Sequence, residues 1–481
     1  MQFNSLPFFL FLPVVFLAYW LLCRGRRSQN AVIVLASAVF YGWWDWRLLG
    51  LIALSAGVSW GGALLVAHYA GQRRHQRLAC VCSVVIQLLI LGFFKYFGFF
   101  AQSLQAVLSW LGFSADWATL HVVLPVGISF YTFQAVSYTV DVYRGTIAAT
   151  RDVVRFLAFL SFFPQLVAGP IERAGRLLPQ FARQRSFDYG RAADGCRQML
   201  WGFFKKMVVA DNCATVVNAV WADAGSQSPL MLAIGAVLFS FQIYCDFSGY
   251  SDIAIGCARL FGISLTDNFR TPYFSRNMAE FWRRWHISLM TWLRDYVYIP
   301  LGGNRRGLPR TLRNTMVVWA VSGLWHGANW TFVCWGLFHG ILLCLRRVAG
   351  GGKPSAAEPP VLRALPAMCG TFLLVTLGWV LFRAPSISAA FSYVGRTVSG
   401  LLSPSGWVLP QLSSALLTAV CGIALMLVCE WYTRNCRHAL QLLDRGVAAR
   451  SVLLRYAVYV GLSMLTMAFA GSQSAFIYFQ F

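Results

Sequence analysis

Three histidines lie where an ionisable side chain is costly and could therefore serve chemistry. His326 lies in the apolar stretch SGLWHGANW and His339 in FHG, so both are expected on consecutive membrane spans joined by a turn near 329–331. His286 is flanked by arginines in a predicted amphipathic helix. An ionisable residue inside a bilayer usually faces the protein interior and is a functional candidate. For His326 function is favoured; for His339 a histidine hydrogen-bonded between packed helices is an equal alternative.

A histidine can act as a base or a hydrogen-bond partner only while its imidazole is neutral. The positive charge of the arginines near His286 disfavours the imidazolium form, so this side chain is expected to be neutral.

A second group of polar residues interrupts an apolar stretch. Asp246, Ser248, Tyr250, Ser251 and Asp252 lie in DFSGYSDIAIGCARLFGI, which carries two acids and three glycines. The stretch FLSFFPQLVAGPIER is interrupted by two prolines. Non-helical backbone at membrane depth persists only when it is buried in protein or lines a wet cavity. Both stretches are therefore predicted to be re-entrant, and the polar side chains either line a site or satisfy broken backbone.

The stretch from Arg270 to Arg313 is strongly basic, with nine arginines against two acids. It includes EFWRRWHISLMTWLRD, where apolar residues at helical spacing predict an amphipathic helix near the cytoplasmic face. Two interpretations of Arg283, Arg284 and Arg294 stay open. They contact anionic lipid headgroups, or they face inward and receive an anionic cofactor or an acidic carrier protein.

These residues must be positioned by membrane-spanning helices. The chain has 481 residues, 58% apolar and only 12% charged, and apolar runs of spanning length recur along it. The net charge of +23 is concentrated in short loops between these runs, which favours a cytoplasmic location for the loops and excludes a nucleic-acid-binding surface. We expect an all-α polytopic membrane protein of about 11–12 transmembrane helices.

Several kinds of chemistry are excluded by motif. The sequence has no GxSxG elbow, Walker loop or HExxH, and no GDS-type serine motif with a distant DxxH. Its thirteen cysteines show neither a CxxC pair nor zinc spacing, so no metal site and no disulfide framework are expected.

Long motifs along nearly the whole chain resemble those of the membrane-bound O-acyltransferase superfamily. The resemblance is to the bacterial branch with alginate O-acetylase and the membrane components of cellulose and peptidoglycan O-acetylation. It rests on six stretches: LPVGISFYTFQAVSYTVDVYRG, FFPQLVAGPIER, YCDFSGYSDIAIG, NFRTPYFSRNMAEFWRRWHISLMTWLRDYVYIPLGGNRRG, GLWHGANWTFVCWGLFHG and FIYFQF.

The resemblance implies a fold and a site. The fold would be one membrane domain over 1–481, a funnel of helices around a central tunnel, with a core at about 121–346 and peripheral helices at 1–120 and 364–481. His326 matches the family's invariant histidine, and His286 matches its second polar position. Acyl transfer from a thioester to a hydroxyl needs a base and donors for the oxyanion. His326 would be the base, His286 would orient the donor carbonyl or relay protons, and Trp325, Asn329 and Trp330 would shape the pocket.

The resemblance also implies substrates and partners. The donor would be acetyl-CoA or a carrier-bound acetyl thioester on the cytoplasmic side, with no bound cofactor. The acceptor would be an exported polysaccharide of the cellulose or alginate type, with peptidoglycan as the alternative. A separate periplasmic acetyltransferase of the SGNH or GDS type and a polysaccharide synthesis and export complex would be partners at the bacterial inner membrane.

Two other classes of protein fit the sequence less well. A proton-coupled transporter would use His326 and His339 as a relay, and it predicts inverted repeats or paired intramembrane charges, neither of which the sequence displays. A structural subunit of an export complex leaves the intramembrane histidines unexplained.

Overall fold

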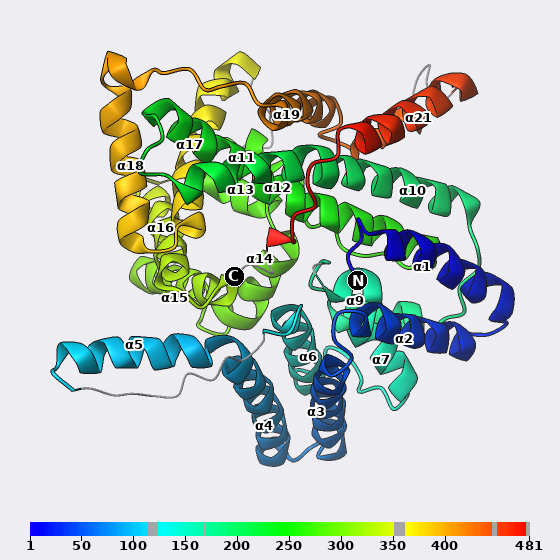
Figure 1. Ribbon diagram of the computed structural model, residues 1–481. Helices are drawn as coiled ribbons and strands as arrows, with labels where there is room; N and C mark the ends of the chain where they lie inside the picture. Colours follow the sequence, from blue (N-terminus) through cyan, green and yellow to red (C-terminus); the bar gives the residue numbers. More distant parts are fainter. Residues whose placement is uncertain (114–123, 168, 351–360, 445–449, 478–481) are drawn as a thin grey trace. The chain divides into compact units, whose positions relative to one another are not determined.

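The computed structural model describes residues 1–113, 124–167, 169–350, 361–444 and 450–477 (Figure 1). This part of the chain is helical and contains no strand, which confirms the predicted all-α class. Its residues form two compact units, one of 1–195 with 254–266 and one of 196–253 with 267–481. The predicted core at about 121–346 stays a prediction, and its boundary at 120 and 121 lies outside the described residues.

The first unit contains the helices of the N-terminal part of the chain. They are α1 (Leu6–Leu17), η1 (Ala18–Leu22), α2 (Arg26–Gly42), α3 (Leu48–His68), α4 (Arg73–Leu91), η2 (Gly92–Tyr96), α5 (Phe97–Trp110), α6 (Ile128–Tyr143), α7 (Val153–Ser161), α8 (Phe163–Leu166) and α9 (Ala174–Phe181). Helices α3, α4 and α6 pack together, and α2 packs on α7. Small polar side chains allow this contact: the Ser59 hydroxyl donates to the Ala135 carbonyl at 2.7 Å.

The helix in the stretch with two prolines, FLSFFPQLVAGPIER, is interrupted as predicted. Helix α7 ends at Ser161, and the single turn α8 begins two residues later with Pro164 in its first turn. The Gln165 amide donates to the Phe159 carbonyl at 2.7 Å, and both residues are buried. The freed backbone is thus satisfied inside protein, as a break at membrane depth requires.

The second unit carries the candidate residues. Helix α10 (Tyr189–Phe203) enters it, and η3 (Phe204–Ala210), α11 (Asp211–Ala222) and α12 (Pro229–Leu260) follow. The remaining elements are η4 (Pro272–Phe274), α13 (Met278–Arg284), α14 (Ile287–Leu293), η5 (Arg294–Tyr298), α15 (Leu308–His326), α16 (Trp330–Val348), α17 (Val361–Arg383), α18 (Ile387–Leu401), η6 (Pro404–Gly406), α19 (Ser414–Tyr432), η7 (Ala439–Asp444) and α21 (Val452–Ala468). Helix α16 packs between α15 and α17, and α11 packs on α19.

The prediction of a re-entrant segment from Asp246 was wrong. These residues form the second half of α12, a continuous helix of 32 residues. Two features that suggested a break have other roles. Asp246 and Asp252 are paired with lysines, and a Cβ on Gly249 would lie 2.8 Å from the Gly202 carbonyl oxygen, so this glycine permits a close helix contact.

The predicted amphipathic helix from Glu280 is also not continuous. It is split into α13 and α14 by two non-helical residues, Trp285 and His286. The apolar residues at helical spacing are all buried in the protein: Phe281, Trp285, Leu289 and Trp292.

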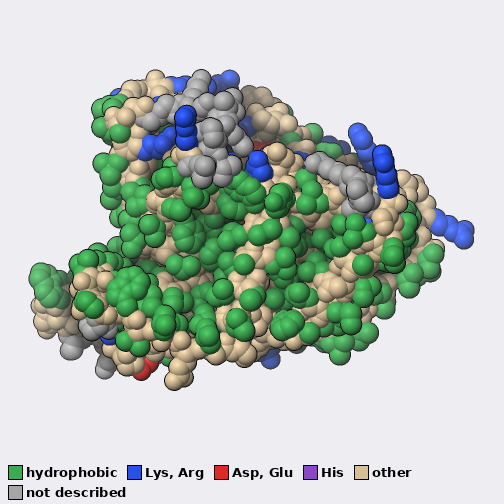
Figure 2. Space-filling view, turned by 90° about the horizontal axis from the view of Figure 1, so that it is seen from above, with side chains coloured by type: hydrophobic (Ala, Val, Ile, Leu, Met, Phe, Trp, Pro, Cys, Tyr) green, Lys and Arg blue, Asp and Glu red, His purple; other side chains and the backbone are tan. Residues whose placement is uncertain are grey.

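The surface of the helices is suited to lipid. Figure 2 shows a face covered mainly by hydrophobic side chains, with most of its visible lysines and arginines toward one edge. Six described stretches are long and apolar enough to cross a membrane: Leu48–His68, Arg73–Trp110, Pro229–Leu260, Trp330–Val348, Arg363–Arg383 and Ser414–Tyr432. Leu6–Leu22 and Val452–Ala468 are apolar but shorter. The chain is a multi-pass membrane protein, and the larger predicted count, the funnel and the tunnel stay predictions.

Candidate functional site

The hairpin of α15 and α16 positions His326. Helix α15 ends at this residue, and Gly327 caps it by donating to the Gly323 carbonyl. The two helices approach closely because glycines face each other's backbone. A Cβ on Gly323 would lie 2.3 Å from the Phe332 carbonyl oxygen, and one on Gly336 would lie 2.2 Å from that of Trp319. The close contact buries His326, of which 4% is exposed.

His286 lies in the break between α13 and α14 with an unusual backbone. Its φ of 44° and ψ of 51° fall in the left-handed region, which costs a non-glycine residue about 1–2 kcal/mol. Two main-chain hydrogen bonds hold the break, one from Ile287 to the Asn268 carbonyl at 3.0 Å and one from Arg270 to the Arg284 carbonyl at 2.9 Å. Strain of this kind is maintained where a side chain must point in a set direction.

Asn268 determines which nitrogen of His286 carries the proton. Its Oδ1 accepts the Ser288 backbone N–H at 3.2 Å and the Ser288 hydroxyl at 2.9 Å. A backbone N–H can only donate, so this atom is the amide oxygen. The same oxygen lies 3.2 Å from Nδ1 of His286, which must therefore be protonated. The lone pair is left on Nε2, where it can accept a proton.

The two histidines lie side by side in an aromatic enclosure. The His286 and His326 ring centroids are 6.4 Å apart. The Trp325 ring lies 5.7 Å from His286 and 4.9 Å from His326, and the Trp335 ring lies 4.8 Å from His326. His286 lies outside the candidate spans, and burial lowers its pKa to about 3. It is neutral, but the cause is burial rather than the predicted repulsion by arginines.

His339 shares one aromatic neighbour with His326. The Trp335 ring lies 4.8 Å from the His326 ring and 5.0 Å from the His339 ring. His339 is fully buried, and within the described part of the chain neither of its nitrogens has a hydrogen-bond partner. Its ring is surrounded by tryptophans: Trp282, Trp319, Trp335 and Trp379. The structure therefore does not provide the hydrogen bond that the packing alternative requires.

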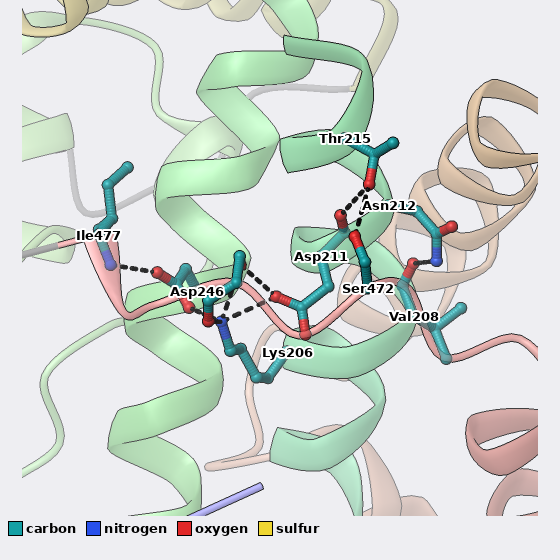
Figure 3. Close-up of polar contacts among 9 residues, drawn as sticks. Lys206, Val208, Asp211, Asn212, Thr215, Asp246, Ser472 and Ile477 are labelled. Carbon is teal, nitrogen blue, oxygen red and sulfur yellow. Dashed lines mark hydrogen bonds and ion pairs between the residues drawn. The ribbon is translucent and has the colours of Figure 1, made fainter. Parts of the chain in front are cut away.

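Asp246 belongs to a buried ionic cluster (Figure 3). The Lys206 ammonium lies 2.8 Å from a carboxylate oxygen of Asp246 and 2.8 Å from one of Asp211. It also donates to the Ser474 carbonyl at 3.1 Å, and the other Asp246 oxygen accepts the Ile477 backbone N–H at 2.7 Å. The cluster thus holds the extended segment 469–477 along η3 and α12.

This segment brings an aromatic ring toward the histidines. Phe476 is buried and packs on Tyr250 at 4.8 Å and on Phe247 at 5.8 Å. Phe247 in turn lies edge-on to His286 at 4.7 Å. Tyr250 therefore contacts His286 only indirectly, through the rings of Phe476 and Phe247. Helix α12 carries both Asp246 of the ionic cluster and Phe247, which contacts His286.

The other polar residues of α12 have separate environments. Asp252 pairs with Lys205 and accepts the Gln198 amide at 2.7 Å. The Ser248 hydroxyl is buried without a hydrogen-bond partner among the described residues. Asp246 and Asp252 therefore act as structural counterions and do not line the histidine pair.

Five further candidates are exposed or have other partners. Asn329 caps α16 by accepting the Thr331 N–H at 3.0 Å, and Trp330 is 53% exposed. Arg284 is bound to Glu280 at 2.7 Å. Arg283 is exposed, and exposed Arg294 is bound to Asp295 at 2.7 Å. The structure thus supports the inward interpretation for none of these three arginines.

Three residues that matter here were not among the candidates predicted from the sequence. Asn268 is the first residue of NFRTPYF, which belongs to one of the motifs that resemble the family, but the motif does not indicate its role. Lys205 and Lys206 are two cations inside the apolar run 197–219. A charged side chain in an apolar run needs an oppositely charged partner. The acidic residues of α12 are candidates for such partners.

The arrangement can move a proton in a dry environment. His286 carries a lone pair on Nε2, and His326 provides a second imidazole beside it, both shielded from water by aromatic rings. Removing a proton from a hydroxyl while it attacks a carbonyl typically contributes about 10²–10⁴-fold to a rate. Among the described residues no group of His, Cys, Asp and Glu is arranged to hold a metal ion.

Comparison with known proteins supports this chemistry. Residues 147–351 match the model of the membrane-bound O-acyltransferase family. The chain is 41% identical to the probable alginate O-acetylase of Pseudomonas aeruginosa over 427 residues, 87% of this chain and 78% of that protein. It is 33% identical to the peptidoglycan O-acetyltransferase of Helicobacter pylori, over 98% of this chain and 96% of that protein. The teichoic acid D-alanyltransferase of Bacillus subtilis is 26% identical over 71% of this chain and 87% of that protein.

The first two similarities exceed what a shared fold alone requires and extend well beyond the matched domain. They include the segments that carry both histidines of the pair. The chain therefore belongs to the membrane-bound O-acyltransferase family and is an acyltransferase.

Proposed function

We propose that the chain is a membrane O-acetyltransferase that takes acetyl from a thioester donor on the cytoplasmic side and passes it across the membrane for O-acetylation of an exported polysaccharide. The observation that carries the proposal is the buried pair of His286 and His326, in which one ring is held by a strained backbone and an amide oxygen. The relatives named above transfer acyl groups to cell-surface polymers, which supports an acceptor of this class.

In the proposed reaction a hydroxyl oxygen attacks the acetyl carbonyl carbon. The new C–O bond forms, the C–S bond breaks, and the thiol leaves with a proton. His326 accepts the hydroxyl proton as a general base. The Nδ1–H of His286 is bound to Asn268, so its Nε2 cannot donate to the donor carbonyl. The geometry therefore favours a proton relay for His286 over orientation of the carbonyl.

The acceptor is proposed from the relatives. An alginate- or cellulose-type polysaccharide is first, because alginate O-acetylases match at 41% identity. Peptidoglycan is the alternative, supported by the Helicobacter pylori relative, which aligns with 98% of this chain. Purified oligosaccharides of alginate, cellulose and peptidoglycan, offered one at a time with the donor and with the separate acetyltransferase proposed below, would separate these acceptors.

A partner is also proposed. Since the sequence has no GDS-type serine motif, a separate periplasmic acetyltransferase of the SGNH or GDS type would place the acetyl group on the polymer. The chain would act at a bacterial inner membrane together with a polysaccharide synthesis and export complex. The donor is either acetyl-CoA or a carrier-bound acetyl thioester.

One observation is consistent with the alternative that the chain is a transporter. Lys206 with Asp246 and Lys205 with Asp252 are buried charge pairs in helices of the apolar domain, a feature that such a protein predicts. Lys206, however, also binds the main chain of segment 469–477. A role in anchoring this segment accounts for the pair, and the relatives transfer acyl groups, so acyl transfer stays the first proposal.

The test uses purified protein in detergent with radiolabelled acetyl-CoA. Thioester hydrolysis and label transfer are followed for the wild type, His326→Ala and the matched buried variant His339→Ala. Circular dichroism and gel filtration establish that each is folded. We expect loss of activity by about 10²-fold or more in His326→Ala and much less in His339→Ala. A folded, fully active His326→Ala protein would show that His326 is a packing residue.

A further inference from the structure

A basic pocket lies in the first unit, in residues that the acyltransferase site does not use. It has a volume of about 910 Å³ and opens to the surface where α2 and α7 begin. Four arginines line it: Arg26, Arg27, Arg151 and Arg155. This volume falls in the range of pockets that hold small ligands, so an anionic group larger than a simple ion can enter.

The pocket has more positively charged than negatively charged lining residues. Asp152 is its one acidic lining residue, against four guanidinium groups. Its carboxylate caps α7 by accepting the Arg155 backbone N–H at 3.0 Å, and it lies 3.8 Å from Arg26. One carboxylate shared in this way leaves a net charge of about three in the pocket.

Two of the four guanidinium groups have internal partners and two do not. Arg26 donates to the Ala182 carbonyl at 3.3 Å, and Arg155 donates to the Thr150 hydroxyl at 3.0 Å. Arg27 and Arg151 are exposed, and within the described chain no hydrogen bond or ion pair engages them. Their donors are available to a ligand.

The backbone adds positive potential at the same place. The pocket is lined by the first turns of α2 (17 residues) and of α7 (9 residues), and neither first turn contains an acidic residue. A helix N-terminus favours negative charge and disfavours arginine. Asp152 offsets this potential at the start of α7 only, so the arginines in the first turn of α2 are in an unfavourable position that a bound anion would relieve.

We propose that this pocket binds a phosphate group, either that of an anionic lipid headgroup or that of a soluble phosphorylated compound. Guanidinium groups bind phosphate through paired N–H···O bonds, and these donors come from Arg27 in the first turn of α2 and from Arg151, two residues before α7. The ordinary alternative is a solvated cluster of arginines that attracts anions without a defined site.

The experiment compares two double variants of the full chain. Arg27→Gln with Arg151→Gln removes the available donors of the pocket. Arg73→Gln with Arg74→Gln is the matched control, because these arginines are also exposed near the start of a helix, α4, but do not line the pocket. All four side chains are exposed, so neither variant removes core packing.

Two arms distinguish the source of the phosphate. In the lipid arm, native mass spectrometry counts phosphatidylglycerol retained from mixed micelles with phosphatidylcholine. In the soluble arm, inorganic pyrophosphate is titrated in neutral detergent while the unfolding temperature is followed. Binding should weaken as the salt concentration rises from about 0.05 M to about 0.5 M.

We expect saturable binding in one arm, weakened about tenfold in the pocket variant and less than about twofold in the control. Loss in the lipid arm identifies a headgroup, and loss in the soluble arm identifies a free phosphate. Equal losses in both variants, unchanged binding in the pocket variant, or no saturable binding by the wild type would each overturn the proposal.

Discussion

The amide of Asn268 controls both the proton and the orientation of His286, although the two residues are 18 positions apart in the sequence. Its oxygen accepts from Nδ1 and from both donors of Ser288. A ring held in this way is ready to accept a proton on Nε2 without first changing tautomer. Substitution of Asn268 should therefore change catalysis more than it changes stability.

The two substitutions of Asn268 should differ in their pH dependence. Asn268→Asp places a carboxylate beside Nδ1, which stabilises the imidazolium form and raises the pKa of His286 from about 3. More of the ring is then protonated at a given pH, so the acid limb of the activity profile should move to higher pH. Asn268→Ala should lower activity by about 10²-fold without this shift.

The measurement is acetyl transfer against pH for the wild type and both variants. If Asn268→Asp and Asn268→Ala lose activity to the same extent at every pH, Asn268 has only a structural role. A shift confined to the aspartate variant is what control of the His286 proton requires.

Lys206 should be among the most sensitive residues for stability. Lys206→Met leaves the buried carboxylates of Asp211 and Asp246 without their cation, which should lower the free energy of unfolding by about 3–5 kcal/mol. Arg294→Met removes one partner of an exposed ion pair and should cost no more than about 1 kcal/mol. Thermal unfolding in detergent would compare them, and equal effects would contradict a structural role for the cluster.

At the residue scale the sequence predicted the reactive side chains better than their partners. The apolar surroundings of His286 and His326 were sufficient to select them. The particular partners of Asn268, Lys205 and Lys206 were not predictable, because each contact depends on two distant segments meeting at a defined register. The roles of Asn329 and Trp330 could not be judged either, since helix capping and exposure depend on where α16 begins.

At the scale of elements, the hairpin of α15 and α16 depends on small residues. Gly323→Ala would place a Cβ 2.3 Å from the Phe332 carbonyl oxygen, so the helices must separate and His326 must move. We expect a cost of about 1–3 kcal/mol in stability and a loss of activity. Gly57→Ala is the control, because a Cβ in that exposed position of α3 meets nothing within 4 Å.

Unfolding temperature and acetyl transfer would test this pair of variants. The control should be neutral, or stabilised by about 0.5–1 kcal/mol through helix propensity. A Gly323→Ala protein as stable and as active as the control would show that the hairpin adjusts without moving His326.

The elements show where hydrophobic patterning fails as a guide. Helix α12 continues through Asp246 and Asp252 because lysines of another helical segment neutralise these acids. The hydrophobic pattern of α12 alone cannot indicate these partners. The break at His286 occurs inside a regular apolar repeat, because main-chain bonds to Asn268 stabilise a left-handed residue. In both places long-range contacts outweigh local preference.

At the scale of the whole molecule, the distribution of basic segments predicts one orientation. The segments that begin at Arg24, Gly71, Arg270, Arg346 and Arg434 should all face the cytoplasm. A protease-sensitive tag inserted in each should be cleaved in inverted vesicles and protected in intact spheroplasts. A tag at 402–410 should behave in the opposite way. Cleavage of the five tags from different sides would show that the predicted set of crossings is wrong.

Anchoring of segment 469–477 by Lys206 also constrains the order of events during synthesis. Lys206 leaves the ribosome long before Ser474, which follows 268 positions later, and Asp246 precedes Ile477 by 231 positions. At synthesis rates of about 5–20 residues per second, Lys206 and Asp246 wait for many seconds without the hydrogen bonds that segment 469–477 supplies. A chain that ends before residue 469 lacks these hydrogen bonds to Lys206 and Asp246, so we expect it to be less stable than the full chain.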